Sequence, residues 1–286
     1  MTPEALLHDW LQARLDSPAG AWLSGTAASV RSSAKDGDLY LAFSLVPRKC
    51  GKGVLGLMPA ELAAADAARP GWKPASLTVD QAARIYLLLA AGGDADAFCR
   101  RLDQLCATAD VAELVVLYRG LPLYPHAERH RLRAAEGVRT NMRSVFEAVA
   151  HGNPYPAEQL EEGPWNQLVL KALFVGSTLD PIAGLDARAN AALARMLCDY
   201  AHERWSAGRP VSPELWRCVG PFATGTMLDD LRRALEQGDT RQKEAAALAL
   251  SRSPDPAASA LLGTYPSLAA RVSDGSISWR SIAATV

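Results

Sequence analysis

The sequence has no excess of charge of either sign. Its 286 residues include 30 basic and 31 acidic side chains, which give a formal net charge of −1 at pH 7. Proteins that bind nucleic acids or membrane surfaces in general need clustered positive charge to neutralise phosphates. The balance therefore argues against a general nucleic-acid or membrane-surface binder, and we expect no nucleic-acid partner.

Cysteine is scarce, and no two cysteines have the spacing of a metal or redox motif. The five cysteines are an odd number without a C-x-x-C pair, which predicts reduced thiols, no disulfide framework and no zinc site. Long hydrophobic runs are also absent, since no run approaches the ~18 residues of a membrane span. The N-terminus lacks the basic and apolar segments of a signal peptide. We therefore expect a cytoplasmic protein without an integral membrane segment.

The common catalytic motifs are absent as well. The sequence has no G-x-S-x-G, no G-x-G-x-x-G and no P-loop. The basic segment "PRKCGKGVLG" lacks the P-loop spacing, but its cations Arg48 and Lys52 are candidates for contact with an anion, with a solvated loop as the alternative. His126 and His130 lie four residues apart without a third ligand. We expect neither a metal nor a cofactor.

Apolar residues at helical spacing dominate the sequence. In residues 77–93, Thr78 and Gln81 have the spacing of a capping box, and Gly92 marks the helix end. Residues 228–256 predict two helices separated by a Gly-Asp-Thr turn, a rhythm typical of HEAT-like hairpins, although no strict repeat period is present. We predict an all-α fold, a multi-helix array of antiparallel hairpins with HEAT-like, α-solenoid character.

No low-complexity linker divides the chain. We predict a single helical domain, residues 1–286. Its expected sub-regions are N-terminal helices over 1–125, a motif-bearing core over 126–225 and HEAT-like helices over 226–286. Residues 38–57 alternate imperfectly, and we interpret them as a helix followed by a loop.

Residues 193–207 predict a two-sided helix with one side chain out of place. Arg204 lies in the middle of the apolar stripe, four residues after Tyr200. A guanidinium cannot lose its charge, so it must find an anion or carbonyl groups. We favour a buried carboxylate from another helix, with a position facing a cavity as the alternative. On the outer side, His202 is expected to lie beside Asp199.

Residues 165–176 are apolar almost all round, as in a buried helix, yet they carry three polar side chains. Gln167 and Lys171 share a narrow polar stripe, and Asn166 lies on the apolar side. Lys171 either reaches solvent by extending its stem along apolar neighbours or lines a polar cavity that binds an anionic or hydroxylated ligand.

Residues 134–156 also combine an apolar helix face with polar side chains, because Arg139 and Asn141 fall on the flanks of a predicted helix. From there a side chain reaches either a neighbouring groove or a loop backbone. Polar side chains on or beside apolar helix faces are how an apolar pocket with a few orienting groups is built. The candidate pocket residues are Arg139, Asn141, Asn166, Gln167, Lys171, Tyr200, His202, Glu203 and Arg204.

The chain resembles the EboA family in these same stretches. The resemblance is carried by residues 134–156, 165–176, 182–190 and 193–222, with weaker agreement at 46–48, 69–74, 80–84, 121–125 and 244–254. It implies a metabolite traffic protein, encoded in bacterial gene clusters with a UbiA-type prenyltransferase, a sugar-phosphate-cyclase-like enzyme and TIM-barrel hydrolase-like proteins. It carries over no catalytic residues.

Three hypotheses follow. We favour a non-enzymatic helical protein of a bacterial secondary-metabolite pathway, which binds or traffics a small metabolite or scaffolds the pathway's enzymes. The first alternative is an enzyme of unrecognised class, an isomerase, lyase or hydrolase that uses His202, Glu203 or Lys171 for proton transfer. The second is a structural adaptor whose polar residues only lock helices together. The expected partners are a small metabolite, other pathway proteins, or both, and no oligomeric state is predicted.

Overall fold

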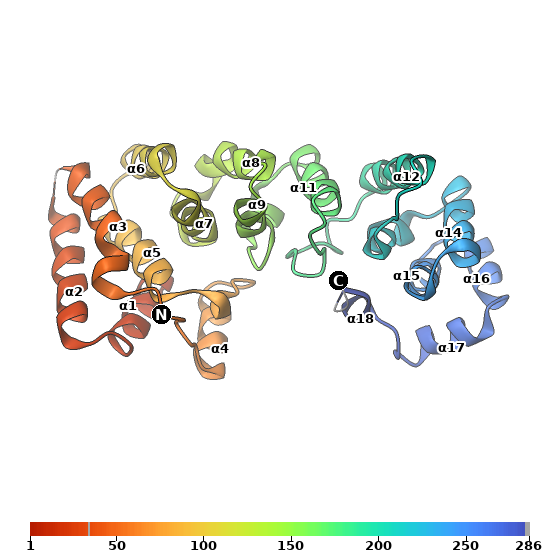
Figure 1. The fold of residues 1–286 in the computed structure, drawn as a ribbon, viewed down its shortest axis with the longest axis horizontal. Coiled ribbons are helices and arrows are strands. Elements are labelled where there is room, and N and C mark those ends of the chain that lie inside the picture. Colours follow the sequence, from red (N-terminus) through yellow and green to blue (C-terminus); the bar gives the residue numbers. More distant parts are fainter. Residues whose placement is uncertain (34, 284–286) are drawn as a thin grey trace. The chain divides into compact units, whose positions relative to one another are not determined.

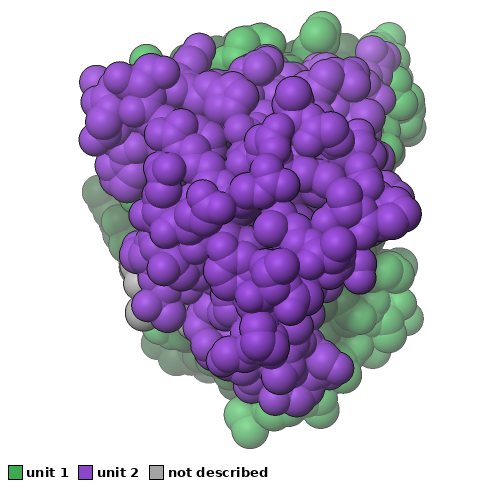
Figure 2. All heavy atoms as spheres, turned by 90° about the vertical axis from the view of Figure 1, so that its right-hand side faces the viewer, with its two compact units in different colours: residues 1–160 green, residues 161–286 purple. Residues whose placement is uncertain are grey.

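The computed structural model describes residues 1–33 and 35–283, and its regular structure is helical. Helices account for 72% of the structure, in 18 α-helices with short 3-10 turns, and the described residues contain no strand. The prediction of an all-α fold is therefore confirmed, whereas HEAT-like solenoid character stays a prediction. The chain divides into two compact units, residues 1–160 and 161–286, coloured separately in Figure 2.

Unit 1 contains the first ten α-helices (Figure 1). They are α1 (Pro3–Gln12), α2 (Ser17–Ser32), α3 (Asp36–Cys50), α4 (Pro59–Ala68), α5 (Val79–Ala91), α6 (Ala95–Thr108), α7 (Val111–Arg119), α8 (Arg131–Arg139), α9 (Arg143–Ala150) and α10 (Tyr155–Gln159). Helix α5 packs against α1, α2, α3 and α7. Because eleven of its thirteen residues are buried, α5 forms the centre of the N-terminal part of this unit.

Unit 2 contains the remaining eight α-helices (Figure 1). They are α11 (Glu162–Phe174), α12 (Ala191–Ser206), α13 (Trp216–Val219), α14 (Thr226–Gln237), α15 (Thr240–Ser251), α16 (Pro256–Gly263), α17 (Pro266–Ser273) and α18 (Trp279–Ala283). The boundary at residue 160 differs from the predicted sub-region boundaries at 125 and 225, and the single-domain assignment stays a prediction.

Local signals set the helix ends where the sequence predicts them. Helix α5 begins after Thr78, whose backbone N–H donates to Gln81 Oε1 at 3.4 Å, and ends at Gly92, which has a φ of +52°. Helices α14 and α15 pack against each other across a two-residue turn, Gly238 and Asp239. A Cβ at Gly238 would lie 2.4 Å from a carbonyl oxygen of α14, so this turn requires glycine.

Residues 38–57 form a helix followed by a loop, as predicted. The loop after α3 is held in place by backbone hydrogen bonds to the segment that leads into α5. The N–H of Leu55 donates to the carbonyl of Leu77 at 2.9 Å, and that of Val79 donates to the carbonyl of Gly53 at 2.8 Å. Val54, between these two bonds, is held in a fixed extended position opposite Thr78.

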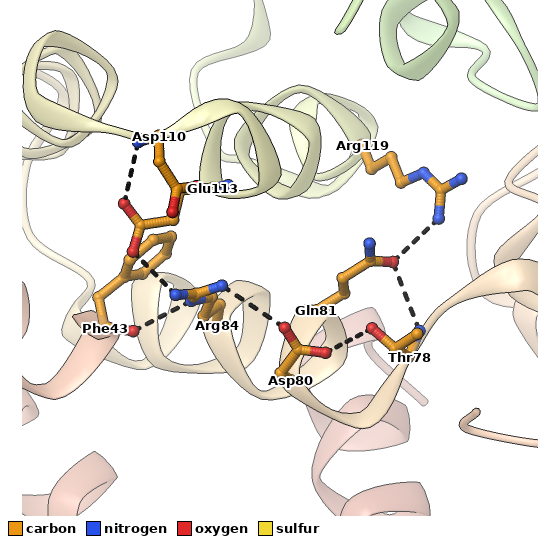
Figure 3. Close-up of polar contacts among 8 residues, drawn as sticks. All are labelled: Phe43, Thr78, Asp80, Gln81, Arg84, Asp110, Glu113 and Arg119. Atoms are coloured by element: carbon orange, nitrogen blue, oxygen red, sulfur yellow. Dashed lines mark hydrogen bonds and ion pairs between the residues drawn. The ribbon is translucent and has the colours of Figure 1, made fainter. Parts of the chain in front are cut away.

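A buried guanidinium ties three helices of unit 1 together (Figure 3). Arg84 of α5 is only 5% exposed. Its Nε donates to the carbonyl of Phe43 in α3 at 3.0 Å, and its Nη2 lies 2.8 Å from Glu113 Oε1 in α7. Its Nη1 lies 3.5 Å from Asp80, which also accepts the hydroxyl of Thr78 at 2.5 Å. Every charge in this cluster therefore has a partner inside the protein, as buried charges require.

Replacement of Arg84 by methionine should destabilise unit 1 strongly. The buried Asp80 and the partly buried Glu113 would lose their cation, and breaking a buried ion pair from one side costs about 3–5 kcal/mol. Urea unfolding followed by circular dichroism measures the loss. The matched control is Arg31→Met, because Arg31 forms an exposed pair with Glu4 and should cost about 0–1 kcal/mol. Similar losses in the two variants would contradict the structural role of the cluster.

Candidate functional site

Asn166, the most deeply placed of the candidate pocket residues, joins two helices. It is buried in α11 and exchanges amide hydrogen bonds with Asn190, at 3.3 Å in one direction and 2.8 Å in the other. Asn190 in turn accepts the N–H of Leu193 at 2.8 Å and so caps the N-terminus of α12. The Asn166 side chain thus locks α11 to the start of α12, as the adaptor hypothesis expects of such residues.

The other candidates on these two helices lie nearer the surface. Lys171 is partly buried, and burial lowers the pKa of its ammonium group. Gln167 and Glu203 are exposed, and Tyr200 is partly buried. Residues 165–176 are apolar almost all round, a pattern typical of a buried helix, but Phe174 in the last turn of α11 is exposed.

Arg139 and Asn141 belong to unit 1, whereas the other candidate pocket residues belong to unit 2. Arg139 is the last residue of α8, Asn141 lies in the connection to α9, and both are exposed. That they share one pocket with the candidates of unit 2 stays a prediction.

Arg204 binds a backbone carbonyl instead of the expected carboxylate. It is partly buried in the last turn of α12, and its Nε donates to the carbonyl of Pro210 at 3.0 Å. It has no ion pair with a carboxylate of the described residues. The chain reverses at Gly208, whose φ is +63°, and this reversal returns the Pro210 carbonyl to the helix end. The loop after α12 therefore supplies the acceptor that the guanidinium of Arg204 needs.

His202 pairs across to another helix and not with Asp199, its expected neighbour. Its Nε2 lies 2.6 Å from Asp230 Oδ1 in α14. Asp230 is nearly buried and also faces Cys198. Burial, together with the charge and hydrogen bonding of Asp230, raises the pKa of the Cys198 thiol to about 12. The thiol is therefore protonated at neutral pH and is a poor nucleophile.

A pocket of about 270 Å³ opens in unit 2 beside the end of α12. We call it the Trp205 pocket; its lining residues are Trp205, Pro210, Val211, Arg233, Ala234, Gln237, Gly238, Asp239 and Gln242. The indole of Trp205 has its centroid 5.9 Å from that of Trp216 and 5.8 Å from that of His202. The guanidinium of Arg233 lies over the Trp205 ring, 4.2 Å from its centroid, at a distance suited to a cation–π contact.

Hydrogen bonds fix the wall of the Trp205 pocket. Gln242 Oε1 accepts the indole N–H of Trp216 at 2.9 Å, and its Nε2 donates to the carbonyl of Val211. Asp239 accepts the N–H of Gln242 at 2.8 Å and caps α15. Arg204, through the Pro210 carbonyl, holds the loop that contributes Pro210 and Val211 to the lining. The lining is therefore formed before any ligand arrives, which lowers the entropic cost of binding.

Arg233 differs from the other polar lining residues, since its charge is not compensated within the described part of the chain. It is exposed, stacks on Trp205 and forms no ion pair with a described carboxylate. Its neighbour Arg232, by contrast, pairs with Asp229 at 2.7 Å. Arg233 was not among the candidates because "DDLRRALEQ" looks like the charged face of an ordinary helix. The Gly-Asp turn that follows was the one sequence signal that α15 returns beside it.

The described residues form an all-helical fold with a pocket in unit 2 whose walls are held by internal hydrogen bonds. The chain belongs to the EboA family: the family model described as "Metabolite traffic protein EboA" matches residues 3–220, which confirms the resemblance found in the sequence. Searches of curated proteins and of solved structures found no match. In the described residues, no helix combines the length and the apolarity needed to cross a membrane.

Substitution of Arg204 by leucine distinguishes a carbonyl partner from a carboxylate partner. Loss of one hydrogen bond to Pro210 should lower the free energy of unfolding by about 0.5–1.5 kcal/mol, well below the ~3–5 kcal/mol of an orphaned carboxylate. Thermal unfolding measures the difference, with Arg195→Leu on the exposed side of α12 as the control. A loss above about 3 kcal/mol would contradict the observed pairing.

Proposed function

We propose that this EboA-family chain is a non-enzymatic protein that binds a small anionic metabolite in the Trp205 pocket and so carries or presents it within a pathway. One observation carries the proposal: the guanidinium of Arg233, which forms no ion pair with a described carboxylate, lies at a pocket where Gln242 and Asp239 already form hydrogen bonds within the protein. The family description, a metabolite traffic protein, agrees with such a role.

The chemistry of the lining indicates the class of ligand. Arg233 offers a planar set of N–H donors suited to a carboxylate or phosphate group. Trp205, Pro210, Val211 and Ala234 supply apolar surface beside it. A volume of about 270 Å³ lies near the lower end of ligand pockets. The pocket therefore suits a small anion or the anionic end of a larger metabolite.

The geometry favours binding over the enzyme alternative. His202 already shares a short hydrogen bond with Asp230, and the thiol of Cys198 is held in its protonated form. Neither His202, Glu203 nor Lys171 lines the Trp205 pocket. A general acid or base has to lie within hydrogen-bond reach of the proton it transfers, and these three residues are not placed so for a ligand in this pocket.

The finer features of the proposal rest on the fold and the family together. The packed pair α14 and α15, joined by a two-residue turn, supports HEAT-like character for the C-terminal helices. A bacterial secondary-metabolite pathway and docking of pathway enzymes are parts of the proposal that derive from the family. A cytoplasmic location is also part of the proposal, and it derives from the cysteine content of the sequence. The amide pair between Asn166 and Asn190 supports the adaptor hypothesis, in which polar residues lock helices together, for Asn166 but for no other candidate residue.

Retention of metabolites on the immobilised full chain tests the proposal. A cell extract is passed over the wild-type chain, Arg233→Ala and Arg232→Ala, and the retained small molecules are identified by mass spectrometry. The wild type and Arg232→Ala should retain the same anionic molecule, because Arg232 pairs with Asp229 and does not line the pocket. The amount of this molecule retained by Arg233→Ala should be lower by about tenfold or more, as expected from loss of a charge-assisted hydrogen bond.

Two outcomes would contradict the proposal. If the wild-type chain retains no small molecule, the pocket has no metabolite ligand. If Arg233→Ala retains the same molecule as fully as Arg232→Ala does, the ligand binds elsewhere on the chain.

A further inference from the structure

Three cations without partners gather at the end of α3. Arg48 and Lys49 lie in its last turn and Lys52 in the loop that follows, and all three are exposed. None forms an ion pair with a carboxylate of the described residues. Of the nearby acids, Asp16 caps α2 and Glu61 pairs with Arg14. The balanced net charge of the chain therefore conceals a local basic cluster.

Exposed apolar side chains lie close to these cations in the sequence. Val54 is 75% exposed and Met58 is 63% exposed, and both lie in the loop between α3 and α4. Leu41, 63% exposed, lies seven residues before Arg48 and hence on the same face of α3. Isolated exposed apolar side chains are ordinary. Several of them interleaved with unpaired cations in one short stretch form an amphipathic surface.

The loop holds these side chains in place. Arg14 of unit 1 donates to the carbonyl groups of Leu55 and Gly56, the latter at 3.1 Å. Its guanidinium also forms two bonds to the Glu61 carboxylate, at 3.0 and 2.6 Å. Together with the backbone pairing on either side of Val54, these bonds fix the loop, so little order has to be gained when it contacts a partner.

We propose that Arg48, Lys49, Lys52, Val54 and Met58 form a docking surface for the face of an anionic lipid bilayer, which we call the basic–apolar surface. Each lysine or arginine near such a bilayer strengthens partitioning by roughly fivefold. Val54 and Met58 enter the boundary between headgroups and acyl chains, while the cationic ends stay at the phosphates.

The side-chain chemistry favours a bilayer over an acidic protein. Protein interfaces draw their affinity from aromatic or arginine anchors that fill pockets in the partner. The basic–apolar surface has no aromatic residue and one arginine, Arg48, beside two lysines, and its remaining exposed side chains are aliphatic. The proposal concerns unit 1 alone and does not depend on ligand binding at the Trp205 pocket.

Co-sedimentation of the full chain with vesicles tests the proposal. The vesicles consist of phosphatidylcholine alone, or of phosphatidylcholine with one third phosphatidylglycerol. The wild type should bind the anionic vesicles and not the neutral ones, and binding should fall as salt screens the charges. Lys52→Glu and Val54→Asp should each lower binding by about tenfold or more. Both side chains are exposed, so the variants should fold normally.

Matched controls come from α8 of the same unit. Arg131→Glu and Leu132→Asp make the same changes of charge and polarity at exposed positions outside the basic–apolar surface, and binding should be unchanged. Absence of binding to anionic vesicles at low salt would overturn the proposal, and so would an equal loss in the α8 controls. Loss in Lys52→Glu with full binding in Val54→Asp would also overturn it, because the contact would then be purely electrostatic.

Discussion

Burial of a polar side chain among packed helices is tolerable only when every donor and charge finds a partner, and Arg84 shows how this protein meets that constraint. Its guanidinium binds a carbonyl of α3 and carboxylates of α5 and α7 at once. In addition to close packing of the apolar side chains, the fixed donor geometry of a planar guanidinium favours one arrangement of these helices. The cluster thus fixes α3 against α5 and, with it, the loop that follows α3.

The same constraint explains why several other polar side chains are placed where helices and loops meet. Asn166 and Gln242 use their amides to join helices and loops, and Arg204 uses its guanidinium to hold a chain reversal. A polar group on an apolar face is costly to leave unpaired, so the fold supplies a partner from within. An unpaired cation persists only where water reaches it, and Arg233 is such a cation. An exposed charge without a partner in the described residues is therefore the feature that marks a candidate binding site in this chain.

The sequence predicts the structure best where the information is local. The caps at Thr78 and Gly92, the end of α3 and the turn between α14 and α15 depend on residues within a few positions of each other. The partners of polar side chains were beyond its reach. His202 binds Asp230, 28 residues away, although Asp199 stands on the same helix. Helical periodicity tells which face a residue occupies, but not which element of the fold covers that face.

The two proposed surfaces follow one physical rule applied to two different surroundings. At the Trp205 pocket, a single cation beside a concave, preformed wall selects a small anion, because donors in a confined space fix the orientation of one ligand. At the basic–apolar surface, dispersed cations and projecting aliphatic groups define no single ligand pose. They match instead a plane of many phosphates above an apolar layer.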